Sequence, residues 1–498
     1  MRGPLRSLAV VAVGIGLVLG AGYVPAPVNV AQGSRPGPAG EAQAEPVTQT
    51  ESICPGPEAL GVGGLPDSVG QTVSVAQTVS VAAVAAPTTA LPTGFSAARG
   101  AGSLAISGLG SDKERSVPVA VRGQVITDQI STARSALITG VGAMAPGTVA
   151  TQWSWTKTGN SRGLVTAACM PPASSSWLVA GGAEPGRQER LVLTNPGPNP
   201  VTVDLTVFGV QGLVDARNGQ GLVIAGYERL VVLLDSLAGS ERSPVVHVTA
   251  RGGEVAAVLS DTWLDGIIPR GGDDSMPVSA PAREQVIAGV PIQGQAILRV
   301  AVPGDSEAVV ESRVLTSNGP KVLPAGGVTR IAGHSTKDID LSSLAPGSYA
   351  VQVRSDAPVV AAVMVDRRRT IRAHSDLAWS VASGPIRTLA GMALPASEVN
   401  GINHQLDLAA TGGPASVLVT TAGALGRAST KEVAIGAYSA STRLLDDATS
   451  VWVTPLTGLV RAAVLTTVTD SRGPLLSLTP LVDLRLRTIP LRLRQLPD

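Results

Sequence analysis

Two short strings in the sequence resemble parts of acyl-transfer active sites. Residues 154–157 (SWTK) match the S-x-x-K pattern of penicillin-binding enzymes, and residues 157–159 (KTG) match their K-T-G pattern. Those patterns belong to a helix start and to a distant strand, so one Lys157 cannot serve both. Residues 333–335 (GHS) begin like a nucleophile elbow, but Lys337 stands where the closing glycine is needed. We therefore expect a polar loop at 333–335 and no catalytic residue in any of these strings.

Side chains that commonly bind metals are few and scattered. None of the four histidines lies four residues from another or next to a cysteine (His247, His334, His374, His404). The acidic pairs Asp273-Asp274 and Asp446-Asp447 lack the spacing of a calcium-binding loop, and their Gly and Ala neighbours predict turns. A phosphate loop, an HExxH motif and a dinucleotide fingerprint in its strand and helix context are missing from the sequence. We expect no metal and no cofactor.

Four tryptophans are candidates for glycan binding. Trp153 and Trp155 are two residues apart, so they share one face of a strand, and with Trp263 and Trp379 they could stack on sugar rings. β-Sandwiches also use tryptophan in their cores. Because the chain has so few aromatic residues, a core role is the stronger interpretation, and both stay open.

A cluster of arginines follows an apolar strand in the middle of the chain. Arg367, Arg368, Arg369 and Arg372 could grip phosphate or carboxylate groups of envelope polymers through their forked donors. The alternative is a solvated loop whose arginines pair with Asp366 and Asp376.

Cys54 and Cys169 are the only cysteines in the chain. An exported chain with two cysteines allows one intramolecular bridge, and neither cysteine has a CxxC partner or a nearby histidine. We predict a structural disulfide. It would also indicate that residues 51–176 form one folded unit.

Composition excludes several classes of protein. Phe, Trp and Tyr make up 2% of the 498 residues, whereas the chain has 57 Gly and 37 Pro, so turns are plentiful and large core side chains scarce. The 38 basic and 37 acidic residues balance, which argues against a nucleic-acid binder. A hydrophobic content of 44% argues against general disorder, and the length predicts several domains.

The N-terminus has the form of an export signal. Arg2 and Arg6 precede an uncharged run from Leu8 to Val24 that is just long enough to span a membrane. We expect residues 1–24 to be a signal anchor, with a cleaved signal peptide as the alternative. Residues 25–50 are rich in Pro, Ala and Gly and predict a flexible linker.

The rest of the chain contains a repeat of about 105 residues. The string Ala-Ala-Val starts at positions 256, 361 and 462, and a matching upstream strand ends in a glycine turn at 197, 304 and 412. This period fits whole domains in tandem. We predict a divergent N-terminal β domain at 51–176 and three repeats at 177–283, 284–386 and 387–498.

Each repeat alternates short Val-, Leu- and Thr-rich stretches with Gly, Pro, Asn or Ser turns, which predicts an all-β fold. Tyr349, after a Leu-Ala-Pro-Gly corner, is typical of the tyrosine corner of immunoglobulin-like sandwiches. We therefore expect tandem immunoglobulin-like β-sandwiches. The QTVSVA duplication at 71–82 shifts a strand by an even number of residues, so we interpret it as a strand extension.

Several strings point to a family: CPGP at 54–57, EPGR at 184–187, LTNPGPNPVTVDLTVFG at 193–209 and SDTWLDGIIPRG at 260–271. They resemble an uncharacterised family of secreted or membrane-anchored actinobacterial proteins, classified as a domain of unknown function. The resemblance implies an extracytoplasmic location in an actinobacterium and no mechanism.

These observations predict a non-catalytic envelope protein, held at the membrane by residues 8–24, whose sandwiches form a scaffold or a partner-binding stalk. Envelope proteins and cell-wall polymers are the expected partners. A glycan-binding accessory module is one alternative, and an enzyme with an unrecognised site in 51–176 is another.

Overall fold

The computed structural model describes residues 44–58, 78–95, 100–110, 119–323, 327–368, 373–395, 401–424 and 426–488. In these ranges the chain is almost entirely β-strand. The helical segments there are α3 (Asp235–Ala238) and the 3-10 turns η1 (Thr88–Ala90) and η2 (Arg217–Gly219). No helix of this part of the chain is long and apolar enough to cross a membrane. The predicted anchor lies outside the described residues.

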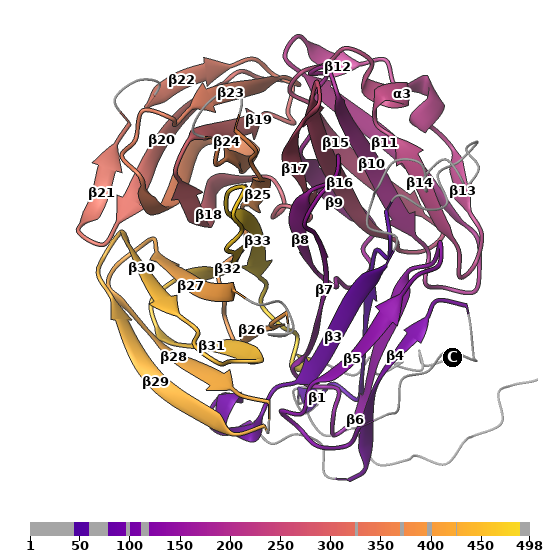
Figure 1. The fold of residues 1–498 in the computed structure, drawn as a ribbon, viewed down its shortest axis with the longest axis vertical. Helices are drawn as coiled ribbons and strands as arrows, with labels where there is room; N and C mark the ends of the chain where they lie inside the picture. The colour runs from indigo at the N-terminus through magenta and orange to yellow at the C-terminus, as the bar shows by residue number, and fades with distance from the viewer. Residues whose placement is uncertain are drawn as a thin grey trace, which may run out of the picture. The chain divides into compact units, whose positions relative to one another are not determined.

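The first sandwich packs a three-stranded sheet, ordered β2-β6-β4, on a four-stranded sheet, ordered β5-β3-β7-β8 (Figure 1). Its strands are β2 (Gln49–Cys54), β3 (Val79–Ala85), β4 (Gly102–Gly108), β5 (Ile126–Ile130), β6 (Ala136–Gly142), β7 (Thr148–Thr156) and β8 (Gly163–Ala168). Val81, Leu104 and Ile138 belong to the core that both sheets share. β3 begins inside the second QTVSVA copy, and the first copy lies outside the described residues.

The second sandwich has the sheets β12-β11-β15-β9, with β13 also on β11, and β14-β10-β16-β17. Its strands are β9 (Ser175–Val179), β10 (Arg187–Thr194), β11 (Val201–Gly209), β12 (Gly212–Val214), β13 (Leu222–Ile224), β14 (Arg229–Leu233), β15 (Val245–Arg251), β16 (Ala256–Asp265) and β17 (Ile268–Ser275).

The third sandwich is built around one long strand, β24, which runs through both sheets. The first half of β24 pairs with β18 and β20, and its second half pairs with β19 and β25. The strands are β18 (Ala282–Ile292), β19 (Gln295–Ala301), β20 (Ala308–Thr316), β21 (Gly319–Val322), β22 (Val328–Ile331), β23 (Thr336–Asp340), β24 (Gly347–Asp366) and β25 (Leu377–Val381). At the start of β24 the Tyr349 hydroxyl donates to the Ala345 carbonyl over 2.8 Å, as a tyrosine corner requires.

The fourth sandwich has the sheets β26-β31-β28-β29 and β30-β27-β32-β33. Its strands are β26 (Ala390–Ala393), β27 (Ile402–Ala410), β28 (Ala415–Ala422), β29 (Ala428–Ile435), β30 (Ser439–Leu444), β31 (Ser450–Thr457), β32 (Val460–Val468) and β33 (Leu475–Leu481).

The two repeat markers of each unit lie on neighbouring strands of one sheet and pair with each other. Each sandwich has seven main strands when β12, β13, β21, β22 and β29 are left aside and the two halves of β24 are counted separately. The upstream markers lie on the second main strand (β10, β19 and β27), and the Ala-Ala-Val strings lie on the sixth (β16, the second half of β24, and β32). The equivalent pairs are Val192 with Val258, Leu298 with Val363 and Leu406 with Val464. In the first sandwich the same two strands pair Val81 with the polar Gln152, whose amide binds the main chain of Gly56. This local use of Gln152 is one reason why the first sandwich does not match the repeat by sequence.

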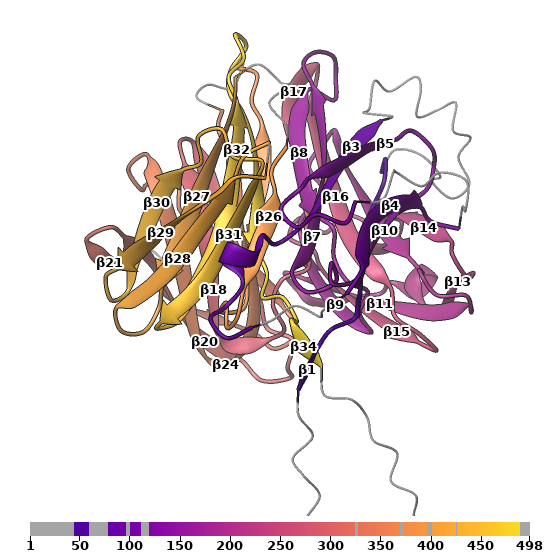
Figure 2. The same ribbon diagram turned by 90° about the horizontal axis from the view of Figure 1, so that it is seen from below.

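The folded part starts earlier than the sequence indicates. Val47 is buried and its N–H donates to the Leu486 carbonyl over 3.0 Å, and β2 begins at Gln49, within the segment expected to be linker. The chain enters at β1 (Glu45–Pro46) and leaves at β34 (Arg487–Thr488), which lie next to each other (Figure 2).

The last strand of each sandwich meets the last strands of two others. Within Pro46–Thr488, β8 contacts β17, β17 contacts β25, β25 contacts β33, and β33 contacts β8. These four inner strands therefore close a cycle, with the rest of each sandwich around them (Figure 1). Every inner strand is the edge of its own sheet, so its outer main-chain groups need partners from elsewhere.

Candidate functional site

A single carboxylate joins the four inner strands. Oδ2 of Asp376 accepts the N–H of Leu164 on β8 (3.1 Å) and of Leu476 on β33 (2.9 Å). Oδ1 accepts the N–H of Leu377 on β25 (3.2 Å) and of Gly272 on β17 (3.4 Å). Asp376 is fully buried, which raises the pKa of its carboxyl well above the usual range, whereas the amides and Arg162 act in the opposite direction.

A buried arginine completes the same region. The Arg162 guanidinium donates to the carbonyls of Ser375 (3.0 Å) and Gly473 (2.5 Å) and forms an ion pair with Asp470 at 3.0 Å. Arg162 lies in the turn before β8, so it ties the first sandwich to the segment before β25 and to the turn before β33. The pKa of Asp470 is lowered, first by the hydrogen bond from the main-chain N–H of Arg472 and then by the hydrogen bond and charge of Arg162.

A ladder of hydroxyl groups continues from Asp376 along the inner strands. Oδ1 of Asp273 accepts a hydrogen bond from the Ser477 hydroxyl at 2.6 Å, and Oδ2 accepts one from the main-chain N–H of Trp379 at 2.9 Å. Thr166 bonds Ser477 and Thr479 at 2.8 Å each. Burial raises the pKa of Asp273 well above its usual range. We call the set Arg162, Thr166, Asp273, Asp376 and Ser477 the central junction.

The sequence predicted a turn at Asp273-Asp274, and this prediction is wrong. Both residues lie in β17 and are buried, because Asp273 serves the central junction and Asp274 faces the first sandwich. Asp446-Asp447 does form an exposed turn. His247 is half-buried and stacks on Trp177 with ring centroids 4.0 Å apart.

Trp379 and Trp263 lie beside a second group of charges. The Trp379 indole donates to Asp261 at 2.7 Å, and Asp261 also accepts two bonds from Arg187, at 2.9 and 2.5 Å. Trp379 is 1% exposed, so its ring cannot reach a glycan. Trp263 is half-buried, with the guanidinium groups of Arg270 and Arg187 at 3.5 and 4.9 Å from its ring centroid.

The other two tryptophans are also covered. Trp153 and Trp155 share a face of β7, as predicted from their spacing. Trp153 is buried with Leu389 and Trp452. Trp155 packs beside Leu164, and the Lys157 ammonium lies 4.4 Å from its ring centroid. Residues 154–156 of the S-x-x-K string therefore lie on β7, and Lys157, which follows the strand, contacts an indole.

The described arginines of the cluster contact residues of the second and third sandwiches. Arg368 forms an ion pair with Asp265 at 2.7 Å, and Arg367 donates to the side-chain oxygen of Gln293 at 3.1 Å. Asp366, expected to pair with this cluster, forms its ion pair with Arg270 instead. Arg369 and Arg372 lie outside the described residues.

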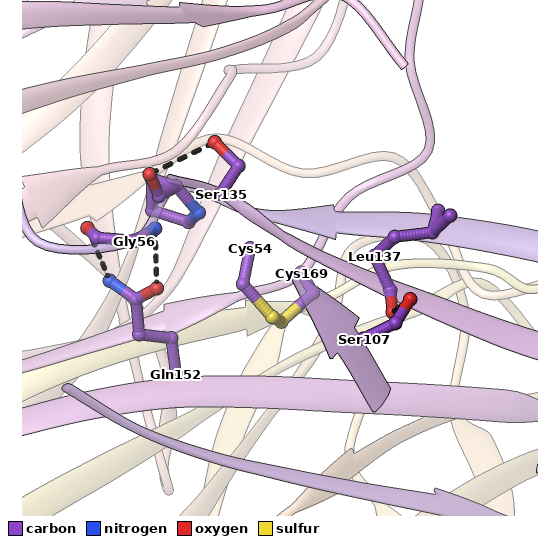
Figure 3. The surroundings of a disulfide bond; sticks show 8 residues. Cys54, Gly56, Ser107, Ser135, Leu137, Gln152 and Cys169 are labelled. Atoms are coloured by element: carbon purple, nitrogen blue, oxygen red, sulfur yellow. Dashed lines mark hydrogen bonds between the residues drawn. A yellow bond between two sulfur atoms is a disulfide. The ribbon is translucent and has the colours of Figure 1, made fainter. Parts of the chain in front are cut away.

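The predicted disulfide between Cys54 and Cys169 is present, with a sulfur–sulfur distance of 1.95 Å (Figure 3). Both cysteines are buried. The adjacent residues Ile53 and Met170 exchange two main-chain hydrogen bonds, of 2.8 and 3.0 Å. Figure 3 also shows the Gln152 amide against Gly56, with bonds of 2.8 and 3.2 Å. The bridge therefore fastens the end of β2 to the segment that follows β8.

A buried acidic pair lies between the first sandwich and the outer face of β17. Burial and the neighbouring Glu58 raise the pKa of Asp274 to about 8, and burial also raises the pKa of Glu58. The Ser260 side chain lowers the pKa of Asp274 and offsets only part of this rise. Arg190 and Arg229 lower the pKa of Glu58.

Replacing Asp274 by asparagine is expected to flatten the pH dependence of stability. The folded pKa of Asp274 lies above the unfolded value of 3.8, so the parent loses stability as pH rises from about 4 to about 8. Between pH 6 and pH 9 the parent should lose roughly 2 kcal/mol relative to Asp274→Asn. Thermal midpoints at both pH values measure this, with Asp446→Asn as the exposed control. Parallel pH curves for parent and variant would contradict it.

A cleft of about 510 Å³ lies beside the first sandwich. It is lined by β2, by β7, by residues 168–172 after β8, and by residues 479–485 at the end of β33 and beyond. Glu254 and Met392 also line it. No group of three or more His, Cys, Asp and Glu side chains suited to a metal ion occurs in the described ranges.

Sequence reasoning missed the central junction. Its members are brought together from segments that lie far apart in the chain, such as Arg162, Asp376 and Ser477. A sequence signal was present only for the neighbouring charge group: the strings EPGR and SDTWLDGIIPRG contain Arg187, Asp261 and Arg270, and charges inside apolar strands indicate buried pairs.

No curated protein and no solved structure matched this chain. The family of unknown function DUF5719 matches residues 125–445, well over half of the chain and all of the second and third sandwiches. The chain therefore belongs to DUF5719.

Proposed function

We propose that this chain is a non-catalytic scaffold outside the cytoplasmic membrane, tethered by residues 8–24, that presents its sandwiches to envelope proteins or cell-wall polymers. The observation that carries the proposal is the central junction, where Asp376 and Arg162 bind main-chain groups of other strands. A general acid or base must reach substrate. These buried groups instead hold the sandwiches in one arrangement, which is what a rigid scaffold needs.

The proposed location rests on the cysteines and the N-terminus. A buried disulfide persists in an oxidising compartment, and the charged start with its uncharged run has the form of an export signal. An actinobacterial envelope is the proposed setting, because of the resemblance of the EPGR and LTNPG strings.

We propose further that the segments 51–176, 177–283, 284–386 and 387–498 derive from one repeated sandwich. All four place their first, third and fifth main strands in one sheet and the others in the second sheet. Immunoglobulin constant domains keep their first two strands in the same sheet. Here β18 pairs with the first half of β24 and β19 with its second half, so the first two strands lie in different layers of the sandwich. Tyr349 therefore supports a tyrosine corner at the start of β24, whereas the repeat has its own strand order.

Crosslinking in intact cells tests the scaffold. A reproducible set of envelope proteins should attach to the full-length chain and disappear when Asp376→Ala disrupts the junction. Hydrolysis of an envelope polymer by the purified chain, lost on replacement of one polar residue, would overturn the proposal.

The glycan-binding alternative is tested by sedimentation of the purified chain with peptidoglycan or arabinogalactan. Because Arg187 and Arg270 cover Trp263, Trp263→Ala is expected to change the bound fraction by less than about twofold. A loss of binding greater than tenfold, with the thermal midpoint unchanged, would favour the glycan module.

A further inference from the structure

β2 has an unpaired stretch of main chain that faces the cleft. Residues along an edge strand point their N–H and C=O alternately toward the paired strand and away from it. Thr48 C=O accepts the N–H of Gly142, next to β6, which sets the even-numbered residues toward β6. Gln49 and Glu51 therefore point their main-chain groups to the opposite edge.

The same edge is held at both ends. Val47 N–H binds Leu486 C=O on one side, and Ile53 exchanges two bonds with Met170 on the other. Between these points Gln49 and Glu51 have no main-chain partner across this edge among the described residues. Both residues line the cleft. Two donor–acceptor pairs, two residues apart, thus remain open on a fixed edge.

A second unpartnered group lies in the same cleft. Thr151 on β7 is fully buried and lines the cleft, and its hydroxyl has no hydrogen-bond partner among the described residues. Buried hydroxyls are normally paired. The cleft therefore offers two open main-chain positions to a ligand, beside a buried hydroxyl without a partner, in a volume typical of ligand sites.

The charges of the cleft favour a cationic ligand. Among the described lining residues Glu51, Glu254 and Asp483 are acidic and Arg485 is basic. Oδ1 of Asp483 already accepts the N–H groups of residues 387–389. Glu51 and Glu254 are exposed, so their carboxylates are accessible to a basic side chain.

We propose that this cleft binds an extended peptide segment of a partner protein, which pairs with Gln49 and Glu51 as an added β-strand and places a lysine or arginine near Glu51 and Glu254. An extended chain repeats its outward N–H and C=O every two residues, which matches the spacing of the two open positions. A second copy of this chain fits less well. In that copy too, residues 479–485 line the cleft beside β2, so its β2 edge is less accessible than a free peptide. This inference rests on the proposed scaffold function and specifies one of its binding surfaces.

Binding of defined peptides tests the proposal. The probe is a fluorescein-labelled heptapeptide, Thr-Val-Lys-Val-Lys-Val-Thr, compared with the same peptide carrying glutamate for lysine, by fluorescence anisotropy with the full-length chain. The lysine peptide should bind saturably and the glutamate peptide at least tenfold more weakly. Raising the salt from 50 to 500 mM should weaken the lysine peptide several-fold.

Variants separate main-chain pairing from charge. Glu51→Pro removes the outward N–H without touching the ladder to β6, so it should weaken binding about tenfold. The double variant Glu51→Gln, Glu254→Gln keeps the main chain. It should weaken the affinity for the lysine peptide about threefold and remove most of the salt dependence of binding. Asp446→Asn, on an exposed turn, should bind as the parent does.

Any of three binding results, or one result in cells, would overturn the proposal. The first is unchanged peptide affinity in a folded Glu51→Pro chain together with unchanged affinity in the double glutamine variant. The second is a dimer that Glu51→Pro dissolves, which would assign the edge to a second copy. The third is binding of a soluble glycan at this cleft in place of the peptide. If crosslinked partners persist in Glu51→Pro cells, the scaffold stands and the cleft proposal fails.

Discussion

Replacing Asp376 by alanine is expected to cost about 3–5 kcal/mol of unfolding free energy and to uncouple the sandwiches from one another. The substitution leaves the buried N–H groups of Leu164, Gly272 and Leu476 without an acceptor and removes the carboxylate near Arg162. Asp376→Asn should also destabilise, because its amide places an NH2 group where the carboxylate accepted N–H donors.

Urea unfolding followed by two probes measures this effect. Tryptophan fluorescence and protease resistance should report one coincident transition for the parent and separate transitions for Asp376→Ala, since the loss acts between sandwiches more than within them. Asp483→Asn is the matched control. Asp483 also accepts hydrogen bonds from several main-chain N–H groups, but in a solvent-accessible position. Asp483→Asn is therefore expected to lower the free energy of unfolding by about 1 kcal/mol and to keep a single transition.

A loss below about 1 kcal/mol for Asp376→Ala, with coincident transitions, would contradict this account. The sandwiches would then be held mainly by apolar contacts such as Met364, Leu377 and Trp379, which share a core with residues of the second sandwich.

Sequence patterns predicted strands well where burial is periodic, because each strand must place every second side chain in a core. The pairing of the repeat markers, Val192 with Val258, Leu298 with Val363 and Leu406 with Val464, was not predicted and comes from the structure. The disulfide was predicted because two cysteines allow one bridge.

The central junction could not be predicted in the same way. Arg162 and Asp470 are separated by 308 positions, and nothing local to either residue indicates the other. Asp273, between glycine and aspartate, has the neighbours of a turn residue, but the inner strands supply donors that make its burial acceptable. Local propensity reports a residue's neighbours in the chain, whereas the junction depends on how four sandwiches meet.

The scarcity of aromatic residues had a structural meaning. Trp379 and Trp452 are among the largest fully buried side chains, so the few indoles fill cores and contacts between sandwiches. A protein with so few rings has little aromatic surface left for sugar stacking, which agrees with the proposed recognition through the main-chain edge and the charges of the cleft.

Removing the disulfide is expected to destabilise the first sandwich by about 3–5 kcal/mol. The bridge joins residues 115 positions apart, and the chain-entropy account gives about 4.7 kcal/mol for a loop of roughly this size. The main-chain bonds between Ile53 and Met170 remain in a Cys54→Ala, Cys169→Ala variant, so the native arrangement should persist with a lower thermal midpoint.

Reductant gives the internal control for this prediction. Dithiothreitol should lower the midpoint of the parent toward that of the double alanine variant and leave the variant unchanged. Proteolysis of the reduced parent should begin in residues 45–58, because the bridge fastens β2 to the segment after β8, whereas the central junction contains no sulfur. An unchanged midpoint in reductant would mean that the Ile53–Met170 and Gln152–Gly56 bonds suffice. A large fall would tie the folded first sandwich to an oxidising compartment, because a reducing one would remove that stability.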